Sequence, residues 1–205
     1  MEDIKLIHGD SLQALNSYAD NHFDVAIVDP PYRDENQPTK DMRKNGSMET
    51  LIGRPTIEYW NELKRVSKNQ IIWGANNFEL PQWKGFVVWK KQTISEDFTM
   101  SMCEVAALSE GLSTTSKFIE IAPQGKKDDP RVHPTQKPRK LYEFLLKHYT
   151  SEGDLILDTH LGSGSIAIAC HYMKRKLIGY EIDKEYYDAA CKRFKEQTMQ
   201  QTLGI

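Results

Sequence analysis

The sequence predicts an α/β fold in which helices cover a doubly wound, mostly parallel sheet. Short apolar runs alternate with helical patterns along most of the chain, as in sheets whose parallel strands are joined by helices. Two of these runs, 23–28 and 154–158, lead into an acidic residue and a turn rich in Pro or Gly. Such sheets bind ligands outside the carboxyl ends of their strands, so polar groups at these two ends predict a site. A hydrophobic fraction of 39% over 205 residues is enough for the core of one domain.

The first two-thirds of the chain supply most of the predicted strands. The expected elements, in chain order, are strands at 4–7, 23–28, 70–73 and 86–89, with helices at 11–18 and 57–66. Two further apolar segments, 104–108 and 117–121, are predicted to pair with each other as an antiparallel edge.

The last third continues the alternation most clearly. Pro138 suits a first helical position, and Leu141, Phe144, Leu145 and Tyr149 follow it on one helical face. The remaining expected elements are a strand at 154–158, a glycine loop at 159–164, a helix at 165–170, a strand at 176–181 and a helix carrying Tyr186, Ala189, Ala190 and Phe194.

Composition excludes several classes of protein. The mean hydropathy is −0.60 and the apolar runs are too short to span a bilayer, so no membrane protein is expected. The chain opens directly into a strand-like run, which argues against a signal peptide. Three widely spaced cysteines without a CxxC pair indicate reduced thiols and a cytoplasmic location, with neither disulfides nor a metal site. The net charge of −2 gives no global attraction to nucleic acid.

The tetrapeptide Asp29-Pro30-Pro31-Tyr32 is the most informative motif. Proline at both middle positions fixes φ and removes two N–H donors, so the backbone carbonyls there face outward unopposed. Asp29 and the Pro30 carbonyl can then accept hydrogen bonds from a planar amino group while Tyr32 stacks on its ring. This arrangement suits chemistry on the exocyclic amine of a nucleobase. The plain alternative is a Pro-Pro loop that ends a strand.

The second motif runs from Asp158 to Gly164. Its two glycines lie between a strand and a helix N-terminus, where backbone approaches a ligand closely and a carboxylate is favoured. The three-glycine spacing of a dinucleotide fingerprint is missing, which argues against NAD. Glu181 ends the next strand, where an acidic side chain can hold ribose hydroxyls. The pattern therefore fits a nucleoside cofactor without pyrophosphate, or else an ordinary glycine-rich turn with an incidental Glu.

Together with His133–Pro138, these motifs resemble the DNA amino-methyltransferases that use S-adenosylmethionine. Asp29–Tyr32 matches their catalytic motif, Asp158–Gly164 their cofactor loop, and His133–Pro138 the segment preceding that loop. Gly9–Ser11 is similar to their N-terminal element and Tyr187–Arg193 to their closing helix. The catalytic motif comes before the cofactor loop, as in the beta class of the family. The resemblance is close over residues 4–32 and 131–195 and general elsewhere.

The resemblance implies a seven-stranded sheet of the Rossmann-like methyltransferase type with an antiparallel edge hairpin, in one catalytic domain spanning 1–205. It implies that the cofactor strand and the catalytic strand lie side by side. The residues it assigns to catalysis are Asp29, Pro30, Pro31 and Tyr32. The residues it assigns to the cofactor are Asp10, Asp29, Thr135, Lys137, Asp158, His160, Gly162, Ser163, Gly164, Glu181 and Ile182.

Within that set, the resemblance places Asp10 at the cofactor's adenine, Glu181 at its ribose, and Thr135, Lys137 and the glycine loop at its methionine part. The plain alternative for Thr135 and Lys137 is an N-cap region for the helix that follows. The family usually carries Pro-Phe where this chain has Thr159-His160. His160 can fill the same space with a flat ring, but it is polar and titratable, so weaker cofactor binding is expected.

Two segments are predicted to serve the substrate. The polar stretch 33–56 is expected to be a mobile loop that gates the site, or else a passive insertion. Segment 109–132 is short for target recognition, and its basic residues Lys117, Lys126, Lys127 and Arg131 are predicted to contact DNA. A solvated basic loop is the alternative.

The resulting hypothesis is a DNA methyltransferase acting on the exocyclic N6 of an adenine flipped out of the duplex. An acidic first residue in the Asp29 motif favours adenine over cytosine N4 by resemblance. A cytosine-N4 enzyme and a non-catalytic DNA-binding regulator on the same fold are the alternatives. The expected partners are DNA and a second copy of the chain, in a restriction–modification pair or as an orphan enzyme.

Overall fold

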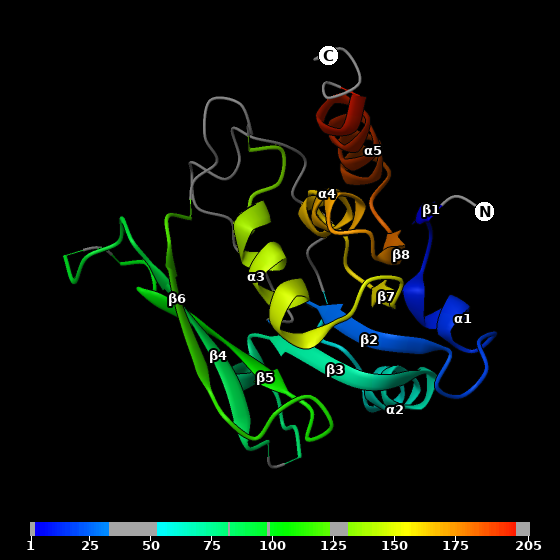
Figure 1. The fold of residues 1–205 in the computed structure, drawn as a ribbon, viewed down its shortest axis with the longest axis horizontal. Coiled ribbons are helices and arrows are strands. Elements are labelled where there is room, and N and C mark those ends of the chain that lie inside the picture. The colour runs from blue at the N-terminus through cyan, green and yellow to red at the C-terminus, as the bar shows by residue number, and fades with distance from the viewer. Residues whose placement is uncertain (1–2, 33–52, 82, 98, 124–130, 200–205) are drawn as a thin grey trace.

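One eight-stranded sheet forms the centre of the protein in a computed structural model (Figure 1). The structure describes residues 3–32, 53–81, 83–97, 99–123 and 131–199. The elements in chain order are β1 (Ile4–His8), α1 (Ser11–Leu15), β2 (Phe23–Val28), α2 (Ile57–Val66), β3 (Ser67–Trp73), η2 (Ala75–Asn77), β4 (Gly85–Lys91), β5 (Cys103–Leu108), β6 (Lys117–Ile121), α3 (Arg139–Tyr149), β7 (Leu155–Asp158), α4 (Ser165–Tyr172), β8 (Lys176–Glu181) and α5 (Lys184–Met199).

The sheet confirms the predicted doubly wound, mostly parallel architecture. The strand order is β1-β8-β7-β2-β3-β5-β4-β6. β5 pairs antiparallel with β3 on one side and with β4 on the other, and the other strand pairs are parallel. The described residues therefore form eight strands where seven were expected, because β6 extends the sheet beyond β4.

The predicted pairing of segments 104–108 and 117–121 is wrong. The antiparallel hairpin is formed by β4 and β5, and β6 lies parallel to β4 with Val88 opposite Phe118. The prediction relied on the tendency of consecutive strands to be neighbours, which holds roughly two-thirds of the time. Here both edges of β5 are already occupied by β3 and β4, so β6 takes the free edge of β4.

Helices cover the sheet on both faces (Figure 1). One apolar cluster joins α3, α4 and α5 to one face, with Leu145 and Ile166 among its buried members. The second cluster joins α1 and α2 to the other face, and α2 contributes Tyr59, Leu63 and Val66 at helical spacing. Among the described residues, no helix combines the length and the apolar character needed to cross a bilayer.

Strand direction gathers the polar motifs at one edge of the sheet. Since β2, β7 and β8 are parallel, Asp29, Asp158 and Glu181 all lie at their carboxyl ends. β2 and β7 pair directly, as expected for the strands that lead into Asp29 and Asp158. The reversed strand β5 begins at this same edge, so Glu104 is brought there as well.

Candidate active site

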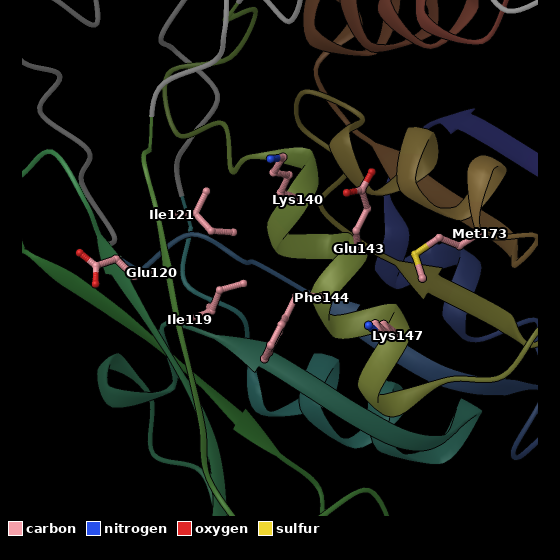
Figure 2. Close-up of a pocket in the computed structure, with 8 residues that line it drawn as sticks. All are labelled: Ile119, Glu120, Ile121, Lys140, Glu143, Phe144, Lys147 and Met173. Carbon is pink, nitrogen blue, oxygen red and sulfur yellow. The ribbon is translucent and has the colours of Figure 1, made fainter.

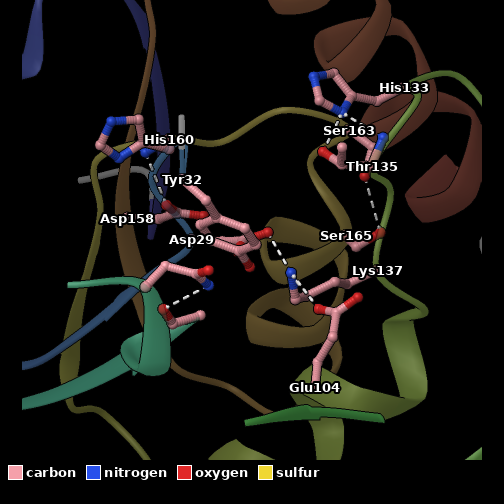
Figure 3. A network of polar contacts seen from close by, with 12 residues as sticks. Asp29, Tyr32, Glu104, His133, Thr135, Lys137, Asp158, His160, Ser163 and Ser165 are labelled. Carbon is pink, nitrogen blue, oxygen red and sulfur yellow. Dashed lines mark hydrogen bonds and ion pairs between the residues drawn. The ribbon is translucent and has the colours of Figure 1, made fainter. Parts of the chain in front are cut away.

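Asp29 lies at the centre of a polar network outside the end of β2 (Figure 3). Its Oδ1 accepts a hydrogen bond of 2.6 Å from the Tyr32 hydroxyl, and its Oδ2 accepts one from the Lys137 ammonium. The side chain of Asp29 is 16% exposed, so the carboxylate is reachable but mostly shielded from solvent. The two sequence motifs that carry these residues are separated by 108 positions and meet here.

The Tyr32 ring is held by a close backbone approach at the end of β3. Gly74 has a φ of 65°, and a Cβ placed on it would lie 2.2 Å from Tyr32 Cε1. The Phe78 ring meets the Tyr32 ring edge-on at 5.9 Å. Burial and the nearby charges of Asp29 and Glu104 raise the pKa of Tyr32 far above its ordinary value, so its hydroxyl remains a donor. Glycine at position 74 is therefore required to seat the ring.

Lys137 is buried between two carboxylates. Its Nζ contacts Asp29 and lies 3.1 Å from Glu104 Oε2, and it stands 5.4 Å from the centre of the Trp73 ring. Burial opposes the charge on Lys137, but Asp29 and Glu104 outweigh it and raise its pKa. No side-chain hydrogen bond caps α3 at Pro138, so the structure does not bear out the N-cap interpretation of this segment.

His133 and Thr135 join this segment to the cofactor loop. Thr135 Oγ1 lies 3.1 Å from His133 Nδ1, and a Cβ on Gly162 would lie 3.5 Å from the His133 ring. The His133 ring also packs edge-on against Tyr186 at 4.3 Å. Burial and the neighbouring cations lower the pKa of His133 to about 4, so the ring is neutral at physiological pH.

The glycine loop has the backbone that the sequence predicts. Gly162 and Gly164 have φ values of 51° and 71°, in the left-handed region that glycine tolerates without strain. A Cβ on Gly164 would also lie 3.2 Å from Ala190 Cβ. Ser163 is buried, and its carbonyl accepts a 2.7 Å hydrogen bond from Arg193. The loop is thus fixed from the side of α5 and presents its backbone at the start of α4.

Glu181 lies beside this loop with acceptor capacity to spare. Its Oε2 accepts from the Gly162 N–H at 2.8 Å and its Oε1 from the Asp183 N–H at 3.0 Å. The Ile182 backbone N–H also stabilises this carboxylate, and since a carboxylate has about four acceptor positions, one remains for a ribose hydroxyl. Ile182 next to it is 60% exposed, and Asp10 caps α1 at the end of the adjacent β1. These residues fit a nucleoside with a free ribose.

Asp158, Thr159 and His160 close the site from the side of β7. Asp158 is buried and accepts the backbone N–H of His160 at 2.9 Å. Burial is the main cause that raises the pKa of Asp158, to about 8, and the charge of Asp29 adds to it. Burial lowers the pKa of His160 to about 4. The imidazole, which is titratable in principle, is therefore uncharged at neutral pH.

Tyr59 of α2 explains how the unusual Thr159-His160 pair is accommodated. The Tyr59 and Thr159 hydroxyls lie 2.6 Å apart, and Thr159 Oγ1 lies 2.9 Å from His160 Nδ1. The Tyr59 ring also meets the His160 ring edge-on at 5.6 Å. This chain of contacts orients the imidazole with its Nε2 edge away from Thr159.

The structure describes two of the four predicted DNA-contact residues, Lys117 and Arg131. Lys117 begins β6, at the amino end and thus at the opposite edge of the sheet. Arg131 is exposed and donates to the His133 carbonyl at 3.2 Å. Lys126 and Lys127, like residues 33–52 of the predicted gating loop, lie outside the described residues.

Several residues of the site escaped sequence reasoning. Trp73, Glu104 and Lys91 come from strands whose matches to known motifs are only general, and Tyr59 comes from a helix that reads as core. The sequence did contain one signal for two of these residues. Lys91 is a charged residue at the end of the apolar strand β4, and Glu104 is a charged residue near the start of the apolar strand β5. Only the pairing of β4 with β5 shows that these two charges meet.

A separate open pocket of about 580 Å³ lies between β6 and α3 (Figure 2). Its lining includes Ile119 and Ile121 of the edge strand and Phe144 of the helix. None of the residues assigned to catalysis or cofactor lines it, so it is distinct from the site around Asp29.

Comparison with known proteins agrees with this geometry. Two curated relatives match nearly the whole chain. The type II methyltransferase M.HpaI of Haemophilus parainfluenzae is 24% identical over 95% of this chain and 75% of its own length. The putative methylase YubD of Escherichia coli (strain K12) is 26% identical over 96% of this chain and 93% of its own.

Solved structures share the fold. The M1.HpyAVI–SAM complex matches with a TM-score of 0.61 at 22% identity, covering 93% of this chain and 98% of that one. The cytosine-N4-specific PvuII DNA methyltransferase matches with a TM-score of 0.64 at 15% identity, covering 96% and 92%. The family model described as DNA methylase matches residues 72–192, more than half of the chain. The chain therefore belongs to the DNA methylase family of N6/N4 methyltransferases.

Proposed function

We propose that this S-adenosylmethionine-dependent DNA methyltransferase acts on the exocyclic N6 of an adenine flipped out of the duplex. Family membership supplies the reaction class, and the choice of base is the proposal. The observation that carries it is the Asp29 carboxylate, with Tyr32 bonded to it, at the carboxyl end of the catalytic strand. By resemblance, an acidic residue at this position favours adenine.

Asp29 prepares the amine for attack. The lone pair of an adenine amino group is delocalised into the ring, which makes the nitrogen a poor nucleophile. Asp29 Oδ1 and the Pro30 carbonyl accept hydrogen bonds from the two N–H groups of the adenine amine. These hydrogen bonds draw the nitrogen lone pair out of conjugation with the ring. The Tyr32 hydroxyl donates to Oδ1 at 2.6 Å, and the second lone pair of this oxygen remains for the amine.

S-adenosylmethionine supplies a methyl group on an electrophilic sulfonium. When it is bound, the amine nitrogen would gain the methyl group as the sulfur–carbon bond breaks, leaving S-adenosylhomocysteine, and the methylated amine would release one proton to solvent. No covalent enzyme intermediate is required, so alignment of the amine with the methyl group carries much of the catalysis. Rigid seating of Asp29 by Lys137 serves this alignment because an immobile acceptor fixes the direction of the lone pair.

The proposed cofactor contacts follow the geometry of the edge. Glu181 accepts a ribose hydroxyl with its remaining acceptor position, Asp10 meets the adenine, and the exposed Ile182 side chain packs on the same ring. Thr135, Lys137 and the Gly162–Gly164 loop hold the methionine part. The flipped base stacks on Tyr32, whose ring is supported by Gly74 and Phe78.

We assign DNA recognition to the segment 109–132 and gating of the site to the loop 33–56. Arg131 is exposed and flanks the His133–Pro138 segment, so it can reach a phosphate near the site. Such a short recognition segment is compatible with a brief target sequence or with a second copy of the chain that helps to grip DNA.

Nucleoside analysis tests the proposal. The protein is incubated with mixed-sequence duplex DNA and methyl-labelled S-adenosylmethionine, and the digested nucleosides are separated. The expected result is label in N6-methyladenosine. Label in N4-methylcytosine would retain the mechanism and overturn the base assignment. Bound cofactor without labelled DNA would instead indicate RNA or another substrate, and failure to bind the cofactor would favour a non-catalytic regulator.

A further inference from the structure

A row of four alternating charges leads from Asp29 into the sheet (Figure 3 shows its first three members). Asp29 contacts Lys137, Lys137 lies 3.1 Å from Glu104 Oε2, and Glu104 Oε1 lies 2.7 Å from Lys91 Nζ. The side chains of Lys137 and Lys91 are only 4% and 9% exposed. Buried ions of this kind are costly unless each is paired, and here each has an opposite charge at contact distance.

The row is assembled by the topology of the sheet. Lys91 ends β4, and Glu104 is the second residue of the antiparallel strand β5, so both stand at the edge where Asp29 follows β2. Trp73 at the end of β3 places its ring beneath the Lys137 ammonium, and Trp89 does the same for Lys91 at 5.6 Å. Because an indole ring covers one side of each ammonium group, the carboxylates are the main hydrogen-bond partners that remain for Lys137 and Lys91.

Lys137 alone would work against the reaction. A buried ammonium beside Asp29 cancels the negative charge that attracts both an amine hydrogen and a sulfonium. The effect is strong because the two groups are in contact and shielded from solvent. A second carboxylate on the far side of Lys137 restores the negative balance near Asp29, and Glu104 occupies that place.

We propose that Glu104 is a positioning residue for methyl transfer: it anchors Lys137 against Asp29 and offsets its charge, while Lys91 anchors Glu104. The inference rests on the proposed catalytic role of Asp29. Glu104 touches neither base nor cofactor and acts through Lys137. The contact of Glu104 Oε2 with Lys137 is an ion pair rather than a well-aligned hydrogen bond, which suits a role in charge balance.

Opposite charges in the row give opposite predictions for cofactor binding. Glu104→Gln removes a negative charge, so affinity for S-adenosylmethionine should fall about tenfold more than affinity for the product S-adenosylhomocysteine, whose sulfur carries no charge. Lys91→Gln removes a positive charge, so the ratio of the two affinities should move the other way. A purely structural role would weaken both ligands together in both variants. The two affinities are measured by titration calorimetry.

Single-turnover methylation of duplex DNA supplies the second readout. Glu104→Gln should slow the chemical step about 10- to 100-fold with little change in KM for DNA. Glu120→Gln is the matched control, since Glu120 forms a similar pair with Lys90 at 3.1 Å on an exposed part of neighbouring strands. If Glu104→Gln fails to fold, Lys91→Gln tests the proposal alone. Its affinity for S-adenosylmethionine relative to S-adenosylhomocysteine should then be higher than in the wild type, and an unchanged or lower value would overturn the role of Glu104.

The outcomes separate the two proposals. A wild-type protein that methylates neither adenine nor cytosine would refute the proposed function. Methylation by the wild type, with Glu104→Gln indistinguishable from Glu120→Gln in rate and in ligand ratio, would overturn only the role of Glu104. A ratio that moves in the same direction in Glu104→Gln and Lys91→Gln would overturn it as well.

Discussion

Replacement of Asp158 by Asn separates stability from cofactor binding at this site. Asp158 is 2% exposed, and burial is the main cause that raises its pKa from 3.8 to about 8. Asn has nearly the same shape and keeps an oxygen for the His160 N–H, which Asp158 Oδ1 accepts at 2.9 Å. The substitution therefore removes the titration of this group while leaving its principal contact.

The size of the effect follows from linkage. In the unfolded chain the carboxyl loses its proton near pH 4, whereas in the folded protein it keeps the proton until about pH 8. A raised folded pKa stabilises the fold below the unfolded value, and that contribution is lost as pH rises through the folded one. The wild type should thus lose stability relative to Asp158→Asn by about 1.4 kcal/mol per pH unit within this window.

Thermal unfolding at pH 6 and pH 8 measures the difference. Between pH 6 and pH 8 the advantage of Asp158→Asn should grow by about 2.3 kcal/mol, because the slope halves at the folded pKa. For a chain of this size that corresponds to about 5–9 °C in the difference between the two Tm values. Asp154→Asn, just before the other end of β7, controls for the loss of one carboxyl group from the same segment.

Cofactor titrations complete the test, because a sulfonium favours the ionised form of Asp158. Wild-type affinity for S-adenosylmethionine should rise between pH 6 and pH 8, with proton release on binding, and affinity for neutral S-adenosylhomocysteine should rise less. Asp158→Asn should bind the two ligands with a pH-independent ratio. A constant Tm difference between pH 6 and pH 8 would refute the argument from burial.

Two further substitutions test how the site is held. Tyr59→Phe removes the hydroxyl 2.6 Å from Thr159 Oγ1 and should weaken S-adenosylmethionine binding about fivefold by calorimetry, corresponding to one hydrogen bond of about 1 kcal/mol; unchanged affinity would show that the Tyr59–Thr159–His160 contacts do not orient the cofactor site. Gly74→Ala would place a Cβ 2.2 Å from Tyr32 Cε1 and should reduce single-turnover methylation at least about tenfold. Gly153→Ala is its control, since Gly153 also has a positive φ, of 88°, but no atom within 4 Å of the added Cβ; equal losses of activity in the two variants would contradict the role of Gly74.

Local sequence patterns were sufficient for the ends of the strands that carry chemistry. Asp29 and Glu181 lie where apolar runs predicted strand ends, and the positive φ values at Gly162 and Gly164 match the glycine loop. The helix predicted at 57–66 has those bounds in the structure, with Thr56 as its N-cap. These features depend on short-range physics: periodicity, capping and the conformational freedom of glycine.

Long-range pairing was the part that local patterns could not supply. β6 pairs with β4 rather than with the preceding strand β5, and this choice depends on which edges are already occupied. The same long-range pairing brings Lys91 to Glu104 and Glu104 to Lys137. Resemblance assigned Lys137 to the methionine end of the cofactor, but its contact with Asp29 appears only in three dimensions.

The central claim is that the Asp29 carboxylate activates the amine of the target base. The most direct test compares Asp29→Ala with the wild type in single-turnover methylation of duplex DNA, with S-adenosylmethionine affinity measured in parallel. The account predicts a loss of at least about 100-fold in the rate of methyl transfer, because an acceptor at the reacting group is removed. Affinity for S-adenosylmethionine should fall as well, because the Asp29 charge attracts the sulfonium, so the two rates are compared at saturating cofactor. Methyl transfer by Asp29→Ala at a rate close to that of the wild type would contradict the claim.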